Sequence, residues 1–451
     1  MAGLSFSSSA QIKSAKLQAS GLTCSMCSNS INKALQTLPF VDKVIANIKE
    51  STFTIKFKEA AKIDIDAIKN KVDDAGFSVA NLSLVMDLDK ISLANDSHMT
   101  VDGSVFHILK TSTKIGSSNQ VVSISDKNFV NAKAFKKNKS LTKMECYETG
   151  VAGKCCSKDG IAAGTRIYHI TSKIFDMKVE AKILRLLAAV CLFLFTKTLT
   201  AQELFVYSEP ASNMAAKAVG IRATTMPMKN FFSKKTDIYS NLEVMVGVSK
   251  NLMLHSEAYF SSIQGNSKFN GAGFYGKYRF YTSDQVHRHF RLAAIGRVTL
   301  LNGLPALSPI NLTADNSGME AGLVATQLIN KYAFSAGASY QQGWDNGDFK
   351  FINANDARHF LAYNIAVGKL MLPKEYVSYD QLNVNLMLEG LGQVNTTTGQ
   401  QYFDLAPSLQ FIIKSKMRVD VGYRLRLSDT YNSVYRQSLL LRFEYNFFNV
   451  F

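Results

Sequence analysis

Two cysteines near the amino terminus have the spacing of a soft-metal site. Cys24 and Cys27 stand in the segment Gly21-Leu-Thr-Cys-Ser-Met-Cys27, directly before a segment with helical periodicity. Thiolates are soft ligands that select Cu(I), with Zn(II) as a competitor. A helix that begins at such a loop lowers the pKa of the thiols through its dipole, which favours the ligating thiolate. With two protein ligands the site stays open, and an open site suits the transfer of an ion to a partner.

The same spacing is found in thiol–disulfide redox motifs, in which Cys24 would attack as a thiolate and Cys27 would resolve the mixed disulfide. A purely structural disulfide is the third alternative. Thioredoxin-type proteins have a different order of elements and usually a Trp or Pro beside the motif, and this loop has neither. We therefore favour metal binding and keep a periplasmic redox module as the alternative.

The elements that must position this loop read strand, helix, strand, strand, helix, strand. Apolar periodicity predicts helices at residues 28–38 and 63–75, and Gly76 ends the second helix. Alternation predicts strands at residues 13–20, 41–48, 53–57 and 78–82.

The motif and this order of elements resemble the heavy-metal-associated (HMA) domain of copper chaperones and metal-pumping ATPases. The matching residues are Gly21 to Cys27 and the closing Asp74-Ala-Gly-Phe77. The resemblance implies an α+β, ferredoxin-like βαββαβ domain at residues 11–82 that holds copper(I), or another soft heavy-metal ion, between its two thiolates. It also implies a protein that donates or accepts the metal. Leu22 stands where the family often has Met, so the identity of the metal stays open.

Residues 83–173 are predicted to form a second, small and mostly β unit, with an OB-like barrel as one form. Cys146, Cys155 and Cys156 stand in one Gly-containing loop of this unit. Three thiols this close predict either a second metal site or one disulfide with a spare thiol, and in an exported protein the disulfide is favoured. The histidines of this unit are interpreted as ordinary strand residues, and they are His98, His107 and His169.

The middle of the chain has the pattern of a secretory signal. Residues 177–201 pass from a basic head through a short apolar core to a polar tail that ends in Ala201. Cleavage is predicted between Ala201 and Gln202. Residues 1–10 look like the tail of another signal peptide. The pattern predicts two exported proteins written as one chain, the first without its own start.

Residues 202–451 lack cysteine and alternate strictly in long strands. In residues 418–427 the apolar set is Val419 to Leu427 at odd positions, and the even positions hold Arg418, Asp420 and two further arginines. Strands of about ten residues with charges on one face and aromatic residues at their ends are typical of an antiparallel transmembrane β-barrel. The strand number must be even when both ends lie on one side, and we predict about twelve.

The last residues resemble the assembly signal of Gram-negative outer-membrane barrels. Phe451 is preceded by Phe447, Tyr445 and Phe443 at alternate positions, and the chain is predicted to stop inside its last strand. The resemblance implies an outer-membrane barrel, and the predicted export signals then place the amino-terminal part in the periplasm. The cargo of the barrel is not encoded in any motif, and a passive pore unrelated to metal is an alternative.

Charge and motifs argue against two other classes of function. The formal net charge is +16, but Lys and Arg are dispersed and mixed with Asp and Glu rather than gathered in one stripe, which argues against nucleic-acid binding. No nucleophile–base constellation and no Gly-rich phosphate loop is recognisable, so we expect a binding protein and not an enzyme.

Overall fold

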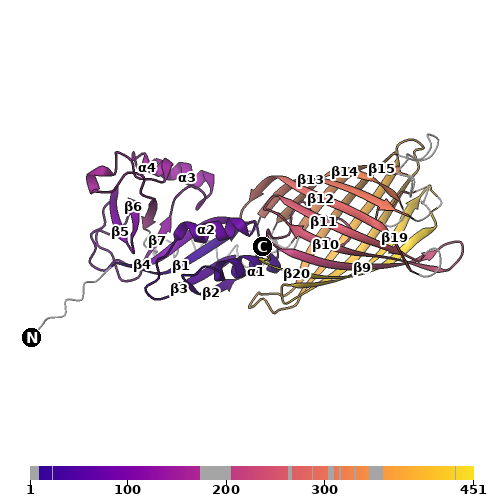
Figure 1. The fold of residues 1–451 in the computed structure, drawn as a ribbon, viewed down its shortest axis with the longest axis horizontal. Coiled ribbons are helices and arrows are strands. Elements are labelled where there is room, and N and C mark those ends of the chain that lie inside the picture. Colours follow the sequence, from indigo (N-terminus) through magenta and orange to yellow (C-terminus); the bar gives the residue numbers. More distant parts are fainter. Residues whose placement is uncertain are drawn as a thin grey trace, which may run out of the picture. The chain divides into compact units, whose positions relative to one another are not determined.

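The computed structural model contains two sheets, an open one from the amino-terminal part of the chain and a closed barrel from the carboxy-terminal part (Figure 1). The predicted signal peptide at residues 177–201 lies outside the described residues, and so does nearly all of the predicted signal tail at residues 1–10. The described residues are 10–22, 24–172, 205–262, 267–286, 288–302, 309–313, 316–329, 332–344, 359–431 and 433–451.

The first six elements follow the predicted order. They are β1 (Gln11–Ser20), α1 (Ser25–Gln36), β2 (Val41–Asn47), β3 (Thr52–Phe57), α2 (Ile65–Asp74) and β4 (Ser78–Asp87). The predicted apolar face of α2 is buried, with Ile65, Ile68 and Val72 at its centre. Burying one such side chain contributes about 1.5–3 kcal/mol. Gly76 has a φ of +93°, a left-handed conformation that ends the helix as predicted.

Six further strands and helices were only partly predicted. They are β5 (Ser97–Val101), β6 (Ser104–Lys110), β7 (Gln120–Ile124), α3 (Ala132–Lys139), α4 (Cys146–Thr149) and β8 (Ile167–Ser172). The short helices α3 and α4 have no long apolar periodicity, which explains why the sequence did not indicate them. Among the helices that the structure describes, none combines the length and the apolarity needed to cross a bilayer.

The predicted boundary after Leu82 is wrong, because it falls inside a single strand. β4 pairs with β1 along one edge, from Gln11 opposite Asp87 to Ser20 opposite Ser78, and with β7 along the other. The strand order is β2-β3-β1-β4-β7-β8-β6-β5, so all eight strands form one open sheet. No OB-like barrel is formed by the described residues of 83–173, because their strands extend the first sheet instead of closing on themselves.

An ion-pair network connects α2 to β8. It therefore links the part of the sheet made of β1 to β4 with the part made of β5 to β8. Arg166 donates to the carboxylate of Asp66 at 2.9 Å and to that of Asp126 at 3.0 Å. The hydroxyl of Tyr168 donates to Asp66 at 3.0 Å. Burial raises the pKa of Asp66, but the hydrogen bonds and the charge of Arg166 outweigh burial and hold that pKa below its ordinary value.

Twelve antiparallel strands close into the barrel, which confirms the predicted number. Their order follows the chain from β9 to β20, and β20 pairs back onto β9. They are β9 (Val219–Asn230), β10 (Thr236–Gly247), β11 (Leu252–Ser261), β12 (Lys268–Asp284), β13 (Arg288–Leu301), β14 (Ser317–Ile329), β15 (Tyr332–Trp344), β16 (His359–Leu372), β17 (Asn383–Asn395), β18 (Gln401–Ile413), β19 (Met417–Asp429) and β20 (Tyr435–Phe447). Because the last strand ends at Phe447, the prediction that it includes Phe451 is wrong.

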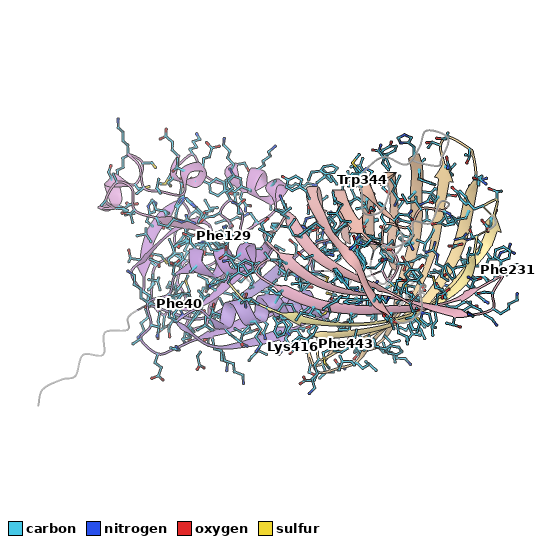
Figure 2. All side chains as sticks on the ribbon, turned by 45° about the vertical axis from the view of Figure 1, so that its right-hand side comes forward. Phe40, Phe129, Phe231, Trp344, Lys416 and Phe443 are labelled. Carbon is cyan, nitrogen blue, oxygen red and sulfur yellow. The ribbon has the colours of Figure 1, made fainter. Side chains whose placement is uncertain are left out.

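The barrel is apolar outside and charged inside, the reverse of a soluble protein. Phe274 is 66 % exposed and Ile365 is 59 % exposed on the outer wall, and Figure 2 shows Phe443 projecting there as well. Lys277 and Arg418 are buried on the inner wall. This distribution is that of a barrel whose outer face meets lipid and whose lumen is polar, as the alternation predicts.

The segment 205–212, here called the plug segment, lies inside the barrel. The carboxylate of Glu389 in β17 accepts hydrogen bonds from three consecutive backbone amides of this segment at 2.8–2.9 Å. It also accepts one from the hydroxyl of Ser208 at 2.6 Å. A buried carboxylate with four donors fixes this end of the plug segment to the wall.

The other end of the plug segment is held on β12. Lys277 donates to the carbonyl oxygens of Pro210 and Ser212 at 2.7 and 2.8 Å. β12 and β17 are five steps apart in the ring of twelve strands, so the segment crosses the lumen. A cavity of about 450 Å³, lined in part by Tyr402 and Arg424, remains within the barrel.

We predict that removal of the Glu389 carboxylate opens the barrel. Each hydrogen bond to a charged group is worth about 1.5–3 kcal/mol, so Glu389→Ala frees one end of the plug segment. Planar-bilayer recordings should show a low conductance for the wild-type barrel and a clearly higher one for this variant. Asp380→Asn, in the connection 373–382, is the matched control and should conduct like the wild type. Equal conductance of all three proteins would contradict the assignment of residues 205–212 as a plug.

Candidate metal-binding site

The loop that carries the first two cysteines is set by the end of β1 and the start of α1. Gly21 has a φ of +88°, which lets the chain turn directly after Ser20. Cys24 lies immediately before α1, and its carbonyl oxygen accepts the amide of Ser28 at 3.2 Å. Cys27 lies in the first turn of the helix. The spacing therefore places one thiol just before the helix and the other on its first turn.

The structure brings Cys24 and Cys27 together as predicted. Their Sγ atoms are 3.1 Å apart, and the amide of Cys27 donates to the Sγ of Cys24 at 3.3 Å. The two sulfur atoms are not joined by a disulfide, which needs a separation of about 2.05 Å. Among the described residues, no group of three potential metal ligands includes either cysteine. Within the described residues the loop thus offers two sulfur donors.

The prediction of a lowered thiol pKa is wrong for Cys24. The hydrogen bond with the Cys27 thiol raises the pKa of Cys24, and this effect exceeds the lowering by the amides of Cys27 and Met26. Metal ions are bound by thiolates, so a soft cation that binds both sulfur atoms would displace the thiol protons.

The second cysteine group is also brought together. The sulfur atoms of Cys146, Cys155 and Cys156 lie within 4.8 Å of one another, and those of Cys155 and Cys156 are 3.4 Å apart. All three are free thiols, so the favoured disulfide is not formed. Burial raises the pKa of Cys146 and of Cys156. Burial also acts to raise the pKa of Cys155, but hydrogen bonds from the backbone of Cys146 and the thiol of Cys156 lower it.

Histidines that were interpreted as ordinary strand residues lie beside this group. His98 in β5 pairs with His107 in β6, and one donor atom from each lies within 4.8 Å of the Cys146 sulfur. Burial and the neighbouring imidazoles of His169 and His98 lower the pKa of His107 to about 4. A signal was available in the sequence, because both histidines are equidistant from Asp102-Gly103, a dipeptide typical of hairpin turns.

One further cluster of potential ligands lies in the barrel lumen. It contains Glu243, His255 and Glu257, which are all buried. The two carboxylates are neutralised by arginines, since Glu243 pairs with Arg222 at 3.2 Å and Glu257 pairs with Arg297. These charges belong to the ion-pair network of the inner wall.

The first cysteine loop lies in a recognised family of domains. Residues 16–78 match the family model described as heavy-metal-associated domain. A probable copper-exporting P-type ATPase of Archaeoglobus fulgidus is 35 % identical over 65 residues, which make up 14 % of this chain and 8 % of the relative. The chain therefore spans less than a tenth of the length of that relative.

Three solved structures are among those that the barrel resembles. A channel from Pseudomonas putida F1 is 14 % identical with a TM-score of 0.38, and the match covers 54 % of this chain and all of the other. OprD of Pseudomonas aeruginosa is 8 % identical with a TM-score of 0.26, over 51 % of this chain and 66 % of the other. OccAB1 of Acinetobacter baumannii is 10 % identical with a TM-score of 0.28, over 47 % and 57 %.

Proposed function

We propose that the amino-terminal domain captures a soft heavy-metal ion between Cys24 and Cys27 and passes it to a partner protein. The observation that carries this proposal is a pair of thiols, 3.1 Å apart and not joined by a disulfide, at the start of α1 in a heavy-metal-associated domain. Two protein ligands leave room for a thiol of the partner to join the ion. Transfer then proceeds by ligand exchange, without release of the ion into water.

Copper(I) is the ion that we propose. Thiolates prefer it among biological metals, and a related segment belongs to a protein named a probable copper-exporting ATPase. Zinc(II) is the competing ion. Leu22 stands at a position where the family frequently has Met, and this departure leaves zinc(II) as the alternative to copper(I).

Thiol–disulfide exchange at the same two residues is the second candidate. The short distance between the sulfur atoms favours it, because a disulfide forms between thiols that are already close. The match of residues 16–78 to the heavy-metal-associated family favours metal binding over it. We therefore rank it below metal transfer.

For the barrel we propose an outer-membrane location, with the amino-terminal domain in the periplasm and no enzymatic activity. Most connections at the end of the barrel that carries the start of β9 are short, residues 373–382 excepted, whereas the opposite end has the connections 302–316 and 345–358. In outer-membrane barrels the short turns face the periplasm. The cargo of the lumen, if any, is open, and a passive pore is the alternative.

We propose that the chain is processed or translated in two parts, because of the signal pattern at residues 177–201. Immunoblots of cell fractions, with one antibody to residues 11–170 and one to the barrel, should show a soluble periplasmic band and a separate outer-membrane band. One membrane band near 49.8 kDa that reacts with both antibodies would contradict the cleavage.

The metal-transfer proposal predicts the loss of one copper(I) equivalent in Cys24→Ser/Cys27→Ser. Without both thiolates, affinity at this site should fall more than about a hundredfold, or on the order of 3 kcal/mol. The measurement is an anaerobic copper(I) titration of the full-length chain in detergent against a chromophoric chelator. Ser25→Ala, which alters the same loop but keeps both thiols, is the control and should bind like the wild type.

The same proteins separate the two candidate functions. In an insulin-reduction assay, the wild type should be inactive if the cysteines serve metal transfer. Unchanged copper uptake by the double variant, together with insulin reduction that depends on Cys24, would replace metal transfer by redox chemistry.

A further inference from the structure

Three histidines lie in register on neighbouring strands of the open sheet. His98 of β5 is opposite His107 of β6, and His107 is opposite His169 of β8. The ring centroids of His98 and His107 are 4.8 Å apart, and those of His107 and His169 are 5.1 Å apart. The strand pairing therefore builds a row of imidazoles across three strands.

Each imidazole in the row is held by a carboxylate on one nitrogen. Nδ1 of His98 is 2.6 Å from Asp159, Nε2 of His107 is 3.0 Å from Asp96, and Nδ1 of His169 is 2.5 Å from Asp126. A carboxylate in this position fixes the tautomer and the ring orientation, and it raises the basicity of the other nitrogen. It is the usual environment of a metal-ligating histidine.

The other nitrogen of each imidazole is buried and has no hydrogen-bond partner. These atoms are Nε2 of His98, Nδ1 of His107 and Nε2 of His169. Buried polar atoms are nearly always paired, because an unpaired one keeps the full cost of its lost hydration. The free nitrogens of His98 and His107 are therefore available as ligands for a metal ion beside Cys146.

Thiols adjoin this row on one side. Cys146 lies within 4.8 Å of donor atoms of both His98 and His107, and it also lies within 4.8 Å of the sulfur atoms of Cys155 and Cys156. In a tetrahedral zinc–thiolate site the sulfur atoms are about 3.8 Å apart. The 3.4 Å between the sulfur atoms of Cys155 and Cys156 is near this value, and Cys146 is the ligand that the thiol group and the imidazole group share. Cys146 and Cys156 are almost fully buried among apolar residues, which makes the site closed.

The geometry points to a second metal centre around Cys146, with thiolate ligands from Cys146, Cys155 and Cys156 and imidazole from His98 or His107. The donor set mixes sulfur and nitrogen, which suits zinc(II) as a four-coordinate ion, and copper(I) is the chemically nearest competitor. Deprotonation of the thiols accompanies binding, so the ion replaces protons on a site whose thiols are free in its absence. Because the ligands come from β5 or β6, from α4 and from the loop after α4, the ion joins the sheet to the segment that follows it.

The test uses the full-length chain in detergent with Cys24→Ser, Cys27→Ser and Cys191→Ser, so that only the proposed centre keeps its cysteines. After reduction, incubation with zinc and dialysis, elemental analysis should find one zinc ion per chain. Adding Cys146→Ser, Cys155→Ser and Cys156→Ser should abolish retention. Adding Ser157→Ala, which alters the same loop but keeps all three thiols, should leave it unchanged.

X-ray absorption on the starting variant keeps the test independent of whether the cysteine variants fold. Its first shell should contain sulfur at about 2.3 Å and nitrogen at about 2.0–2.1 Å. His98→Gln/His107→Gln should lose the nitrogen shell and retain sulfur. The same mixed shell around copper(I), with no zinc retained, would support the site and reassign its ion. No retained ion, or a shell of oxygen and nitrogen alone, would overturn the proposal.

Discussion

The pairing of β4 on both of its edges is the constraint on which the amino-terminal part of the structure depends. One edge holds β1, which delivers the loop of Cys24 and Cys27 to the start of α1. The other edge holds β7, and β7 in turn holds β8, which pairs with β6. The paired thiols and the histidine row are therefore positioned by one continuous hydrogen-bonded sheet. The hydrogen bond from Tyr168 to Asp66 adds a side-chain contact between β8 and α2, and Arg166, directly before β8, forms an ion pair with the same carboxylate.

In the barrel, the corresponding constraint is the closure of the sheet, in which β20 pairs back onto β9. Each strand pairs with two neighbours, so no edge is left to lipid, and alternate side chains are forced to the outside or into the lumen. Buried charges inside are compensated by one another and by the plug segment, as when Arg222 pairs with Glu444 at 2.9 Å and Lys277 binds carbonyl oxygens of the segment. The interior is thus a network of paired charges crossed by residues 205–212.

Patterns with a strict period were predictable from the sequence. The alternation of residues 418–427 gave the correct faces of β19, and the helical period gave the buried face of α2. The cysteine spacing gave Cys24 and Cys27 as neighbours. The predicted domain boundary after Leu82 was wrong. β4 continues past Leu82, and nothing in its sequence marks the residue at which its pairing with β7 begins. The predicted lowering of the Cys24 pKa was also wrong. The hydrogen bond with the Cys27 thiol raises this pKa by more than the neighbouring backbone amides lower it.

The features that the sequence did not predict depend on contacts between residues that are far apart in the chain. The plug segment has no periodicity, and only the position of Glu389 shows that its amides are bound inside the barrel. Likewise, His169 enters the row through a parallel pairing with β6, which joins residues that are far apart in the sequence. Within that row, the pairing of His98 with His107 had a local signal in the sequence, which is the hairpin turn at Asp102-Gly103.

X-ray absorption at the copper edge tests the central claim most directly. The sample is the full-length chain with Cys146→Ser, Cys155→Ser and Cys156→Ser, loaded anaerobically with one equivalent of copper(I). Capture between Cys24 and Cys27 predicts a first shell of sulfur alone at low coordination number, and the loss of that shell when both are also replaced by serine. A shell dominated by nitrogen or oxygen, or one that survives the replacement of both cysteines, would contradict the account.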